Sequence, residues 1–284
     1  MSVHLIFDFL DVFFIEIDIN HCIFRGTQRI QLMKNEIEHN LLTLSKTGSK
    51  DLWPSISNHV LQLSSSYWLA NFGNSLVVLN LSNNHLQGSI QDAFTNMTSL
   101  RTLNLSSNQL QGDLSSFGQM CSLNKLYISR NNLTGELSQL FGCVENSLKI
   151  LQLDGNKLHS SLPDITRFTF MRELNLSWNQ LNGSLPERFS QHSKLVLLHL
   201  NDNQLTGSLT DVAMLSSLRE LGISNNRLNG TVSESIGSLF QLEKLHVGGN
   251  SLQGVMSEAH FSNLSKLTVL DLSDNSLALK FQSN

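Results

Sequence analysis

A motif of about 24 residues recurs nine times between Leu76 and the C-terminus of the 284-residue chain. Each copy follows the frame L-x-x-L-x-L-x-x-N-x-L, and successive frame asparagines are 23 to 25 residues apart. The nine frame asparagines are Asn84, Asn108, Asn131, Asn156, Asn179, Asn203, Asn226, Asn250 and Asn275. A period of this size predicts a solenoid in which each repeat forms one structural unit.

The alternating leucines within each copy predict one short β-strand per repeat. In a strand, residues two apart point to the same face, so Leu103 and Leu105 face one way and Asn104 the other. One such strand cannot bury its leucine face alone, so successive turns must stack their strands in parallel. Burial of each aliphatic side chain contributes roughly 1.5 to 3 kcal/mol, which makes this stacking the main source of stability.

The frame asparagines are predicted to be structural rather than functional. Each follows a strand at an inward-turning corner, where backbone N–H and C=O groups lose contact with water and need partners. A side-chain amide offers donors and acceptors, so it can bond the backbone of its own turn and of the adjacent turn. Asn108 is followed by Gln109 and Leu110, which excludes it as a glycosylation acceptor.

The repeats resemble the plant extracellular type of leucine-rich repeat, whose pattern is LxxLxxLxLxxNxLxGxIPxxLGx. Seven copies have the glycine four residues after the asparagine, whereas Ser160 departs from it, and the IP proline is present only at Pro163 and Pro186. The segment EAHFSNLSKLTVLDLSDNSLALKF (258–281) is similar to ectodomains of plant receptor-like proteins. The resemblance implies an α/β leucine-rich-repeat solenoid, a right-handed horseshoe with a parallel β-sheet on its concave face and mostly irregular or 3-10 convex segments.

The resemblance also implies a function. It indicates a non-enzymatic recognition module, the extracellular part of a plasma-membrane receptor-like protein that binds a peptide, protein or glycan ligand and a co-receptor kinase in defence or developmental signalling. The alternatives are a secreted inhibitor of cell-wall-degrading hydrolases and a truncated receptor fragment without function. The sequence contains no hydrolase, P-loop or kinase motif and predicts no cofactor. A formal charge of −4 does not favour nucleic acid or an anionic membrane as partner.

Three segments are predicted along the chain. Residues 1–51 lie outside the repeat and have no assigned fold, residues 52–75 are a degenerate leading repeat, and residues 76–284 form the array, whose ninth repeat is incomplete. Four acidic residues interrupt the apolar N-terminus, so neither a signal peptide nor a membrane span is predicted there. Without end caps or juxtamembrane parts, the chain is interpreted as a truncated copy of a longer receptor-like protein.

The outward-facing strand positions are the predicted ligand-binding surface, because they are rigidly presented and can vary without touching the core. An exposed Trp178 beside Tyr and Arg has the composition of an interaction hot spot. Two histidines on this surface can make recognition sensitive to mildly acidic pH. The predicted set is Tyr127, Arg130, Gln152, Trp178, His199, Asp202 and His246.

Two further kinds of site follow from residue positions. Cys121 and Cys143 occupy nearly equivalent places in successive turns, which puts their Cα atoms about 5 Å apart, within reach of a disulfide. Two buried thiols are the alternative. No cysteine or histidine cluster has metal-ligand spacing, so no metal site is predicted.

Eight N-x-S/T sequons are candidate glycosylation sites, although an Asn- and Ser-rich repeat generates several by itself. Asn80, Asn104 and Asn175 are predicted to lie on the concave strands, where a glycan would obstruct a ligand. Asn96 and Asn263, in the variable backs of their repeats, are favoured. The candidate acceptors are Asn96, Asn263, Asn132, Asn182 and Asn229.

Overall fold

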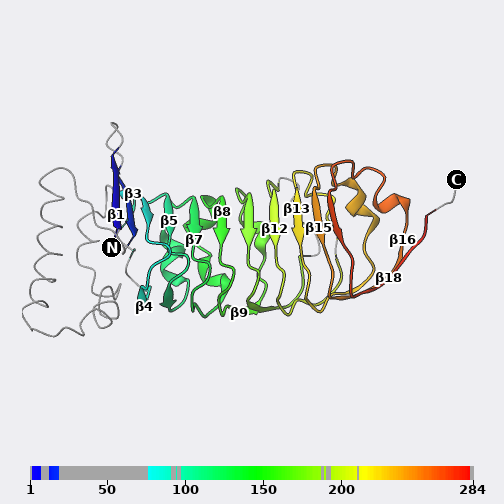
Figure 1. The fold of residues 1–284 in the computed structure, drawn as a ribbon, viewed down its shortest axis with the longest axis horizontal. Coiled ribbons are helices and arrows are strands. Elements are labelled where there is room, and N and C mark those ends of the chain that lie inside the picture. Colours follow the sequence, from blue (N-terminus) through cyan, green and yellow to red (C-terminus); the bar gives the residue numbers. More distant parts are fainter. Residues whose placement is uncertain are drawn as a thin grey trace, which may run out of the picture.

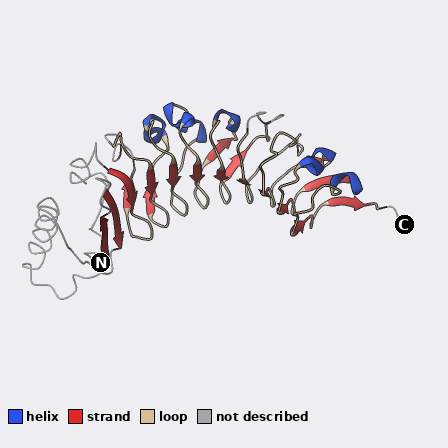
Figure 2. Cartoon of the chain, turned by 90° about the horizontal axis from the view of Figure 1, so that it is seen from above, coloured by secondary structure: helices blue, strands red, loops and turns tan. Residues whose placement is uncertain are grey.

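The chain forms a curved solenoid of stacked turns, with the strands along the inside of the curve and short helices on the outside (Figure 1, Figure 2). This architecture comes from a computed structural model that describes residues 2–7, 13–18, 76–90, 94, 97–186, 189, 193–209 and 211–281. The predicted boundaries at residues 51 and 75, and the degenerate leading repeat, lie outside the described residues.

The concave face is one sheet, and each of the nine repeats contributes one strand to it. The repeat strands are β3 (Leu76–Asn80), β5 (Thr102–Asn104), β7 (Lys125–Tyr127), β8 (Ile150–Gln152), β10 (Glu173–Asn175), β12 (Leu197–His199), β13 (Glu220–Gly222), β15 (Lys244–His246) and β17 (Val269–Asp271). They pair in parallel with the frame leucines in register, as in Leu174 beside Leu198. The predicted parallel sheet with one strand per turn is thereby confirmed.

Two strands precede the repeats in the same sheet. β2 (Phe13–Asp18) pairs in parallel with β3, and β1 (Ser2–Phe7) pairs antiparallel with β2. The sheet therefore has eleven strands among the described residues, in the order β1-β2-β3-β5-β7-β8-β10-β12-β13-β15-β17. Of the predicted non-repeat segment 1–51, only these two strands are described.

The rest of each turn is short secondary structure and loop. Secondary strands form three small parallel sheets: β4 (Gln87–Ser89) with β6 (Gln109–Gln111), β9 (His159–Ser161) with β11 (Gln180–Asn182), and β14 (Asn229–Gly230), β16 (Ser251–Met256) and β18 (Ser276–Leu279). The convex side carries the 3-10 helices η2 (Ser115–Gln119), η3 (Leu137–Leu140), η4 (Cys143–Asn146), η5 (Ile165–Arg167), η6 (Glu234–Ser238) and η7 (Glu258–His260). The predicted irregular and 3-10 convex face is confirmed.

A continuous apolar core runs through the stack. The second frame leucine is buried in the strands of the first eight repeats, for example Leu103, Leu126 and Leu151, whereas Leu270 of β17 is 44% exposed. The parallel stacking places equivalent side chains one strand spacing apart, so each repeat completes the core of its neighbour. Phe94 and Phe117 fill the convex side of this core with ring centroids 6.4 Å apart.

The frame asparagines connect successive turns through hydrogen bonds. Asn108 Nδ2 donates to the carbonyls of Leu105 in its own turn and Leu81 in the preceding turn, at 2.9 and 3.0 Å. Its Oδ1 accepts from Leu86 N at 3.0 Å. The same arrangement recurs at Asn131 and at every later frame position up to Asn275. Each asparagine thus pairs backbone groups of two turns, the structural role that the sequence predicts for it.

A disulfide joins two adjacent convex segments. The structure bonds Cys121 to Cys143, with Cα atoms 4.9 Å apart. Immediately beside the bridge, a Cβ placed on Gly142 would lie 2.4 Å from the carbonyl oxygen of Gly118. Only glycine fits there, because that backbone approach leaves no room for a side chain.

Candidate ligand-binding groove

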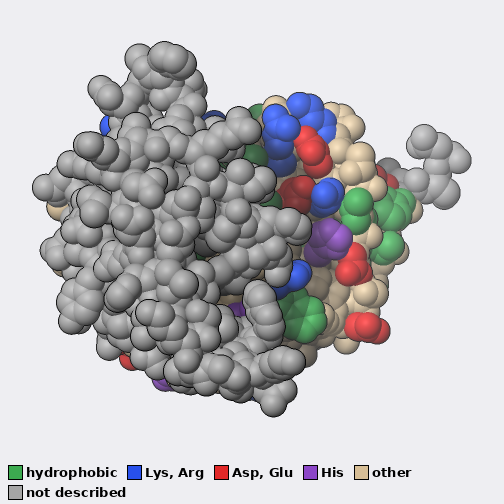
Figure 3. Space-filling model, turned by 60° about the vertical axis from the view of Figure 1, so that its left-hand side comes forward, with side chains coloured by type: hydrophobic (Ala, Val, Ile, Leu, Met, Phe, Trp, Pro, Cys, Tyr) green, Lys and Arg blue, Asp and Glu red, His purple; other side chains and the backbone are tan. Residues whose placement is uncertain are grey.

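A groove of about 630 Å³ lies on the concave face and is lined by side chains from seven successive repeats. We use the term concave groove for these lining residues: Arg130, Asp154, Gly155, Asn175, Ser177, Trp178, His199, Asn201, Asp202, Glu220, Ser224, Lys244, His246 and Asp271. In the space-filling view, basic, acidic and His side chains are interspersed with a few hydrophobic ones on the visible face (Figure 3). Most of the lining residues have a polar or charged side chain, so the groove is polar.

Five of the seven predicted binding residues line this groove: Arg130, Trp178, His199, Asp202 and His246. Tyr127 and Gln152 end β7 and β8 on the same face but are not among the lining residues. Burial and the nearby carboxylate of Glu173 raise the pKa of Tyr127. The phenol is therefore uncharged at neutral pH.

The sequence analysis missed several groove residues. Asp154, Ser177 and Asn201 follow the third frame leucine of their repeats, and Glu220 and Lys244 begin their strands. Our prediction considered only the middle outward position and the position before the frame asparagine. The same repeat period identifies these two further outward columns, so the signal was present in the sequence.

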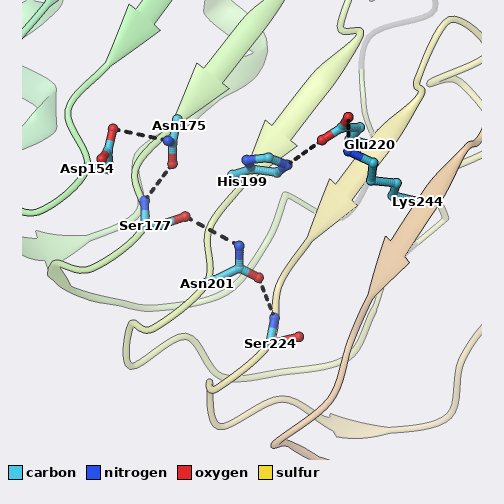
Figure 4. Close-up of polar contacts among 8 residues, drawn as sticks. All are labelled: Asp154, Asn175, Ser177, His199, Asn201, Glu220, Ser224 and Lys244. Carbon is cyan, nitrogen blue, oxygen red and sulfur yellow. Dashed lines mark hydrogen bonds and ion pairs between the residues drawn. The ribbon is translucent and has the colours of Figure 1, made fainter. Parts of the chain in front are cut away.

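Hydrogen bonds between neighbouring repeats fix the floor of the groove (Figure 4). Asn175 Nδ2 donates to Asp154 Oδ1 at 3.0 Å, and Asn175 Oδ1 accepts from Ser177 N at 3.1 Å. Asn201 Oδ1 accepts from Ser224 N at 2.9 Å, and Asn201 Nδ2 lies 3.5 Å from Ser177 Oγ. The bonds of Asn175 to Asp154 and of Asn201 to Ser177 and Ser224 cross from one repeat to the next, and the bond from Ser177 N orients Asn175 within its own repeat.

Gly222 makes room for part of this network. It occupies the middle outward position of β13, where a Cβ would lie only 2.6 Å from Asn201 Nδ2. The missing side chain lets the Asn201 amide lie across the neighbouring strand and reach Ser224. The glycine thus shapes the floor of the groove, although it is not one of the lining residues.

A cluster of charged groups centres on Glu220. One carboxylate oxygen lies 3.3 Å from His199 Nε2 and the other lies 2.9 Å from Lys244 Nζ (Figure 4). Burial lowers the pKa of His199, and the nearby His246 and Lys244 act in the same direction, while Glu220 opposes them. His199 is therefore neutral at pH 7 and presents an uncharged ring to the groove.

Replacing Glu220 with glutamine should lower the pKa of His199 further, because the carboxylate is the group that favours the imidazolium. The lowered pKa also means that His199 takes up a proton more readily in the unfolded chain than in the folded one. The free energy of unfolding therefore decreases as the pH falls below the ordinary pKa of histidine. Titration of the His199 Cε1–H signal by NMR measures the shift. Glu243→Gln is the control, since Glu243 pairs with Arg219 instead. An unchanged or raised pKa in Glu220→Gln would contradict this assignment.

Trp178 combines high exposure with a strained backbone. It is 66% exposed, and its φ is 58°. The residue before the frame asparagine has a φ between 50° and 67° in all nine repeats. The other occupants are Asn83, Ser107, Arg130, Gly155, Asp202, Asn225, Gly249 and Asp274. Glycine, asparagine and aspartate tolerate this left-handed conformation, whereas a bulky aromatic residue there costs about 1 to 3 kcal/mol.

The strain at Trp178 is not offset by burial, because the ring is mostly in water. A strained residue that contributes little to the core is typical of a functional position rather than a structural one. Trp178 also lies within the concave groove. Structure and sequence thus single out the same side chain on independent grounds.

The predicted glycosylation sites divide by exposure. Asn182, Asn229 and Asn263 are exposed, Asn132 is half-buried, and Asn96 lies outside the described residues. Asn80, Asn104 and Asn175 end β3, β5 and β10 on the concave face. Asn175 is also bonded to Asp154 and Ser177, so a glycan attached there would disrupt the groove floor.

Two further searches cover the residues that the structure describes. They contain no group of three or more His, Cys, Asp or Glu side chains arranged to hold a metal ion. No described helix has the length and apolar character that crossing a bilayer requires.

The concave parallel sheet, the 3-10 convex side and the asparagine ladder together define a leucine-rich-repeat solenoid. Sequence comparison agrees: the family described as Leucine rich repeat matches residues 58–110, 74–133, 170–192 and 215–277, together more than half of the chain. The chain belongs to the leucine-rich-repeat family, and its resemblance to plant receptor ectodomains is shown by the solved structures. A comparison with curated protein sequences found no match.

Solved structures similar to this chain include two receptor ectodomains of Arabidopsis, the first of them from Arabidopsis thaliana. The plant membrane receptor kinase GASSHO1/SCHENGEN3, in complex with CASPARIAN STRIP INTEGRITY FACTOR 2, is 33% identical over 73% of this chain and 25% of its own, with a TM-score of 0.66. The receptor kinase HAESA, in complex with an IDA peptide hormone ligand, is 30% identical over 73% of this chain and 39% of its own, with a TM-score of 0.60.

A third similar structure is a plant ice-binding protein. It is 29% identical over 73% of this chain and 68% of its own length, with a TM-score of 0.60. The chain thus spans about a quarter to two fifths of the two receptor ectodomains and about two thirds of this protein.

Proposed function

We propose that the concave groove binds a peptide ligand and that the chain acts as the recognition part of a receptor-like protein. The observation that carries the proposal is Trp178, an exposed aromatic side chain held in an unfavourable backbone conformation inside a polar groove. Exposed tryptophan is the residue type most enriched among the side chains that dominate binding energy. No catalytic chemistry enters the proposal.

The shape of the groove supports an extended ligand. Its lining residues come from seven consecutive strands, so a peptide lying across the strands would contact one repeat after another. The hydrogen bonds of Asn175 and Asn201 fix the floor before any ligand arrives, which lowers the entropic cost of binding. The similar HAESA ectodomain was solved with a peptide hormone.

The setting of the proposal follows from the family resemblance. We place the recognition module on the extracellular side of the plasma membrane, with a co-receptor kinase as the second partner and a role in defence or developmental signalling. Exposed Asn182, Asn229 and Asn263 would carry glycans away from the concave groove.

Hydrogen–deuterium exchange with a bound peptide tests the location of binding. A peptide selected from a random library on the full chain should slow amide exchange around β10, β12 and β13, whose residues line the groove. The convex helices η5 and η6 serve as the internal control and should exchange as before. Protection confined to the convex side, or a library that yields no binding peptide, would refute the proposed function.

Replacing Trp178 with asparagine should weaken peptide binding at least about tenfold while raising the melting temperature. Asparagine occupies the same position at Asn83 and Asn225, so it accommodates the left-handed φ and relieves about 1 kcal/mol of strain. Titration calorimetry and thermal denaturation measure the two effects.

Phe240→Asn is the matched control, because Phe240 is another exposed aromatic residue that does not line the groove. It should leave peptide affinity unchanged. A Trp178→Asn variant that is destabilised and binds normally would instead assign Trp178 a structural role.

A further inference from the structure

Acidic side chains lie around Trp178 at the ends of the concave strands, whereas exposed basic side chains lie at the starts of the same strands. We use the term acidic edge for the last two outward positions of repeats four to nine: residues 154–155, 177–178, 201–202, 224–225, 248–249 and 273–274. These positions include Asp154, Asp202 and Asp274 and no lysine or arginine. Trp178 is their one aromatic residue. Basic side chains border the acidic edge: Arg130 has the same position in repeat three and lines the groove, and Lys149, Arg172 and Arg219 are exposed at the start of the strands.

Two of these carboxylates belong to the turns that flank Trp178. The residue before the frame asparagine is Gly155 in the preceding turn and Asp202 in the following turn, and Asp154 precedes Gly155. Adjacent strands of the sheet lie about 5 Å apart. Asp154, Trp178 and Asp202 all line the concave groove. An indole face and two carboxylates are thus offered to the same ligand.

Hydrogen bonds leave one oxygen of each carboxylate for a ligand. Both bonds that the described residues make to Asp154, from Ser129 Oγ and Asn175 Nδ2, end on Oδ1. The bond from Asn225 Nδ2 to Asp202 also ends on Oδ1, at 2.9 Å. Each carboxylate is therefore held in place by Oδ1 while its Oδ2 atom makes none of these bonds.

The amides of the same region are already used within the protein. Asn175, Asn201 and Asn225 each donate from Nδ2 to a neighbouring side chain, and Asn175 and Asn201 also accept a backbone N–H. Each of these amides keeps a second Nδ2 proton, and Arg130 and Ser224 also line the groove as donors. Immediately around Trp178, the free acceptors are the Oδ2 atoms of Asp154 and Asp202, and together with the indole face they match a cation.

We propose that the groove around Trp178 binds the arginine or lysine side chain of a peptide ligand, with the cation over the indole and paired with Asp154 and Asp202. This inference rests on the proposed function and adds the chemical class of the ligand. A guanidinium fits best, because its planar fork stacks on an aromatic ring and pairs with carboxylates at the same time.

A peptide library selected on the full chain tests the ligand class. The recovered peptides should be enriched in arginine and lysine. Replacing the critical arginine with citrulline, which keeps the shape but removes the charge, should lower affinity about tenfold by calorimetry. Recovered peptides without such residues, or citrulline peptides that bind equally well, would overturn the inference.

Paired variants of the protein test the proposed position. The double variant Asp154→Asn and Asp202→Asn keeps both Oδ1 acceptors, so the groove floor should persist, and circular dichroism melting checks that it folds. Its affinity for the arginine peptide should fall about tenfold, while its affinity for the citrulline peptide should not change. Asp164→Asn, which removes one carboxylate charge at the N-cap of the convex helix η5, should have no effect on either affinity. Equal loss for both peptides, or no loss, would contradict a cation at this position.

The outcomes also separate this inference from the proposed function. Peptides that protect the groove from exchange without requiring a cation would overturn the inference alone. A library without groove-binding peptides would refute both. Binding of neutral oligosaccharides that depends on Trp178 would assign the groove to glycans and overturn the cationic-peptide class.

Discussion

Replacing Asn156 with leucine should lower the free energy of unfolding by about 3 kcal/mol. Asn156 is 8% exposed, and its Oδ1 accepts the buried Leu133 N–H at 3.0 Å. Its Nδ2 also donates to the carbonyls of Ile128 and Leu153. Leucine has a similarly branched side chain but is larger and can make none of these bonds, so a buried N–H loses its partner in the middle of the array. Urea denaturation followed by circular dichroism measures the change.

Asn275→Leu is the matched control for that substitution. Asn275 makes the equivalent bonds to Leu252 N, Val247 O and Leu272 O. It is less buried, however, and Asp274 and Ser276 beside it are exposed. Water can replace part of the hydrogen bonding that Asn275→Leu removes, so this variant should lower the free energy of unfolding clearly less than Asn156→Leu does. Equal destabilisation by both variants would show that position along the array does not govern the contribution of the ladder.

Removing the Cys121–Cys143 bridge should destabilise the array by about 3 kcal/mol, because the bridge closes a loop of moderate length in the unfolded chain. The two cysteines are 22 residues apart in sequence. The double variant Cys121→Ser and Cys143→Ser removes the cross-link with little change in volume. Denaturation of both proteins with and without a reducing agent measures its contribution.

A reducing agent provides the control for the disulfide. It should lower the stability of the original chain to that of the double serine variant and should leave the variant unchanged. The bridge lies on the convex side, away from the groove-lining residues, so peptide affinity measured below the melting temperature should not change. Two free thiols in the oxidised, folded chain would rule out the bridge.

The repeat determined how much of the fold could be predicted. Because the frame leucines recur at a fixed interval, the nine strands and their parallel order follow from Leu76 onward without any other information. The hydrogen bonds of the frame asparagines could be predicted in the same way, because asparagine recurs at the same corner of every repeat. The strands β1 and β2 were not predicted, because that part of the chain shows no period on which to base an assignment.

The binding site was less predictable than the fold. The repeat period identifies every outward-facing position, yet it does not show which of these positions line the concave groove. The role of Gly222 depends on the reach of Asn201 from the next strand, which sequence spacing does not encode. The strain at Trp178 was also hidden, because it becomes visible only when the shared φ of all nine turns is known.

The amide bridges across the groove floor have a consequence for how ligands would be discriminated. Asn175 and Asn201 connect neighbouring concave strands before any ligand binds, so the groove surface has little freedom to adapt to a peptide that fits poorly. Selectivity then depends on the peptide, whose side chains must be spaced to match the fixed groove and whose backbone must already be rigid. Among peptides of equal charge, those already extended in solution, such as proline-containing ones, should bind more tightly than flexible ones.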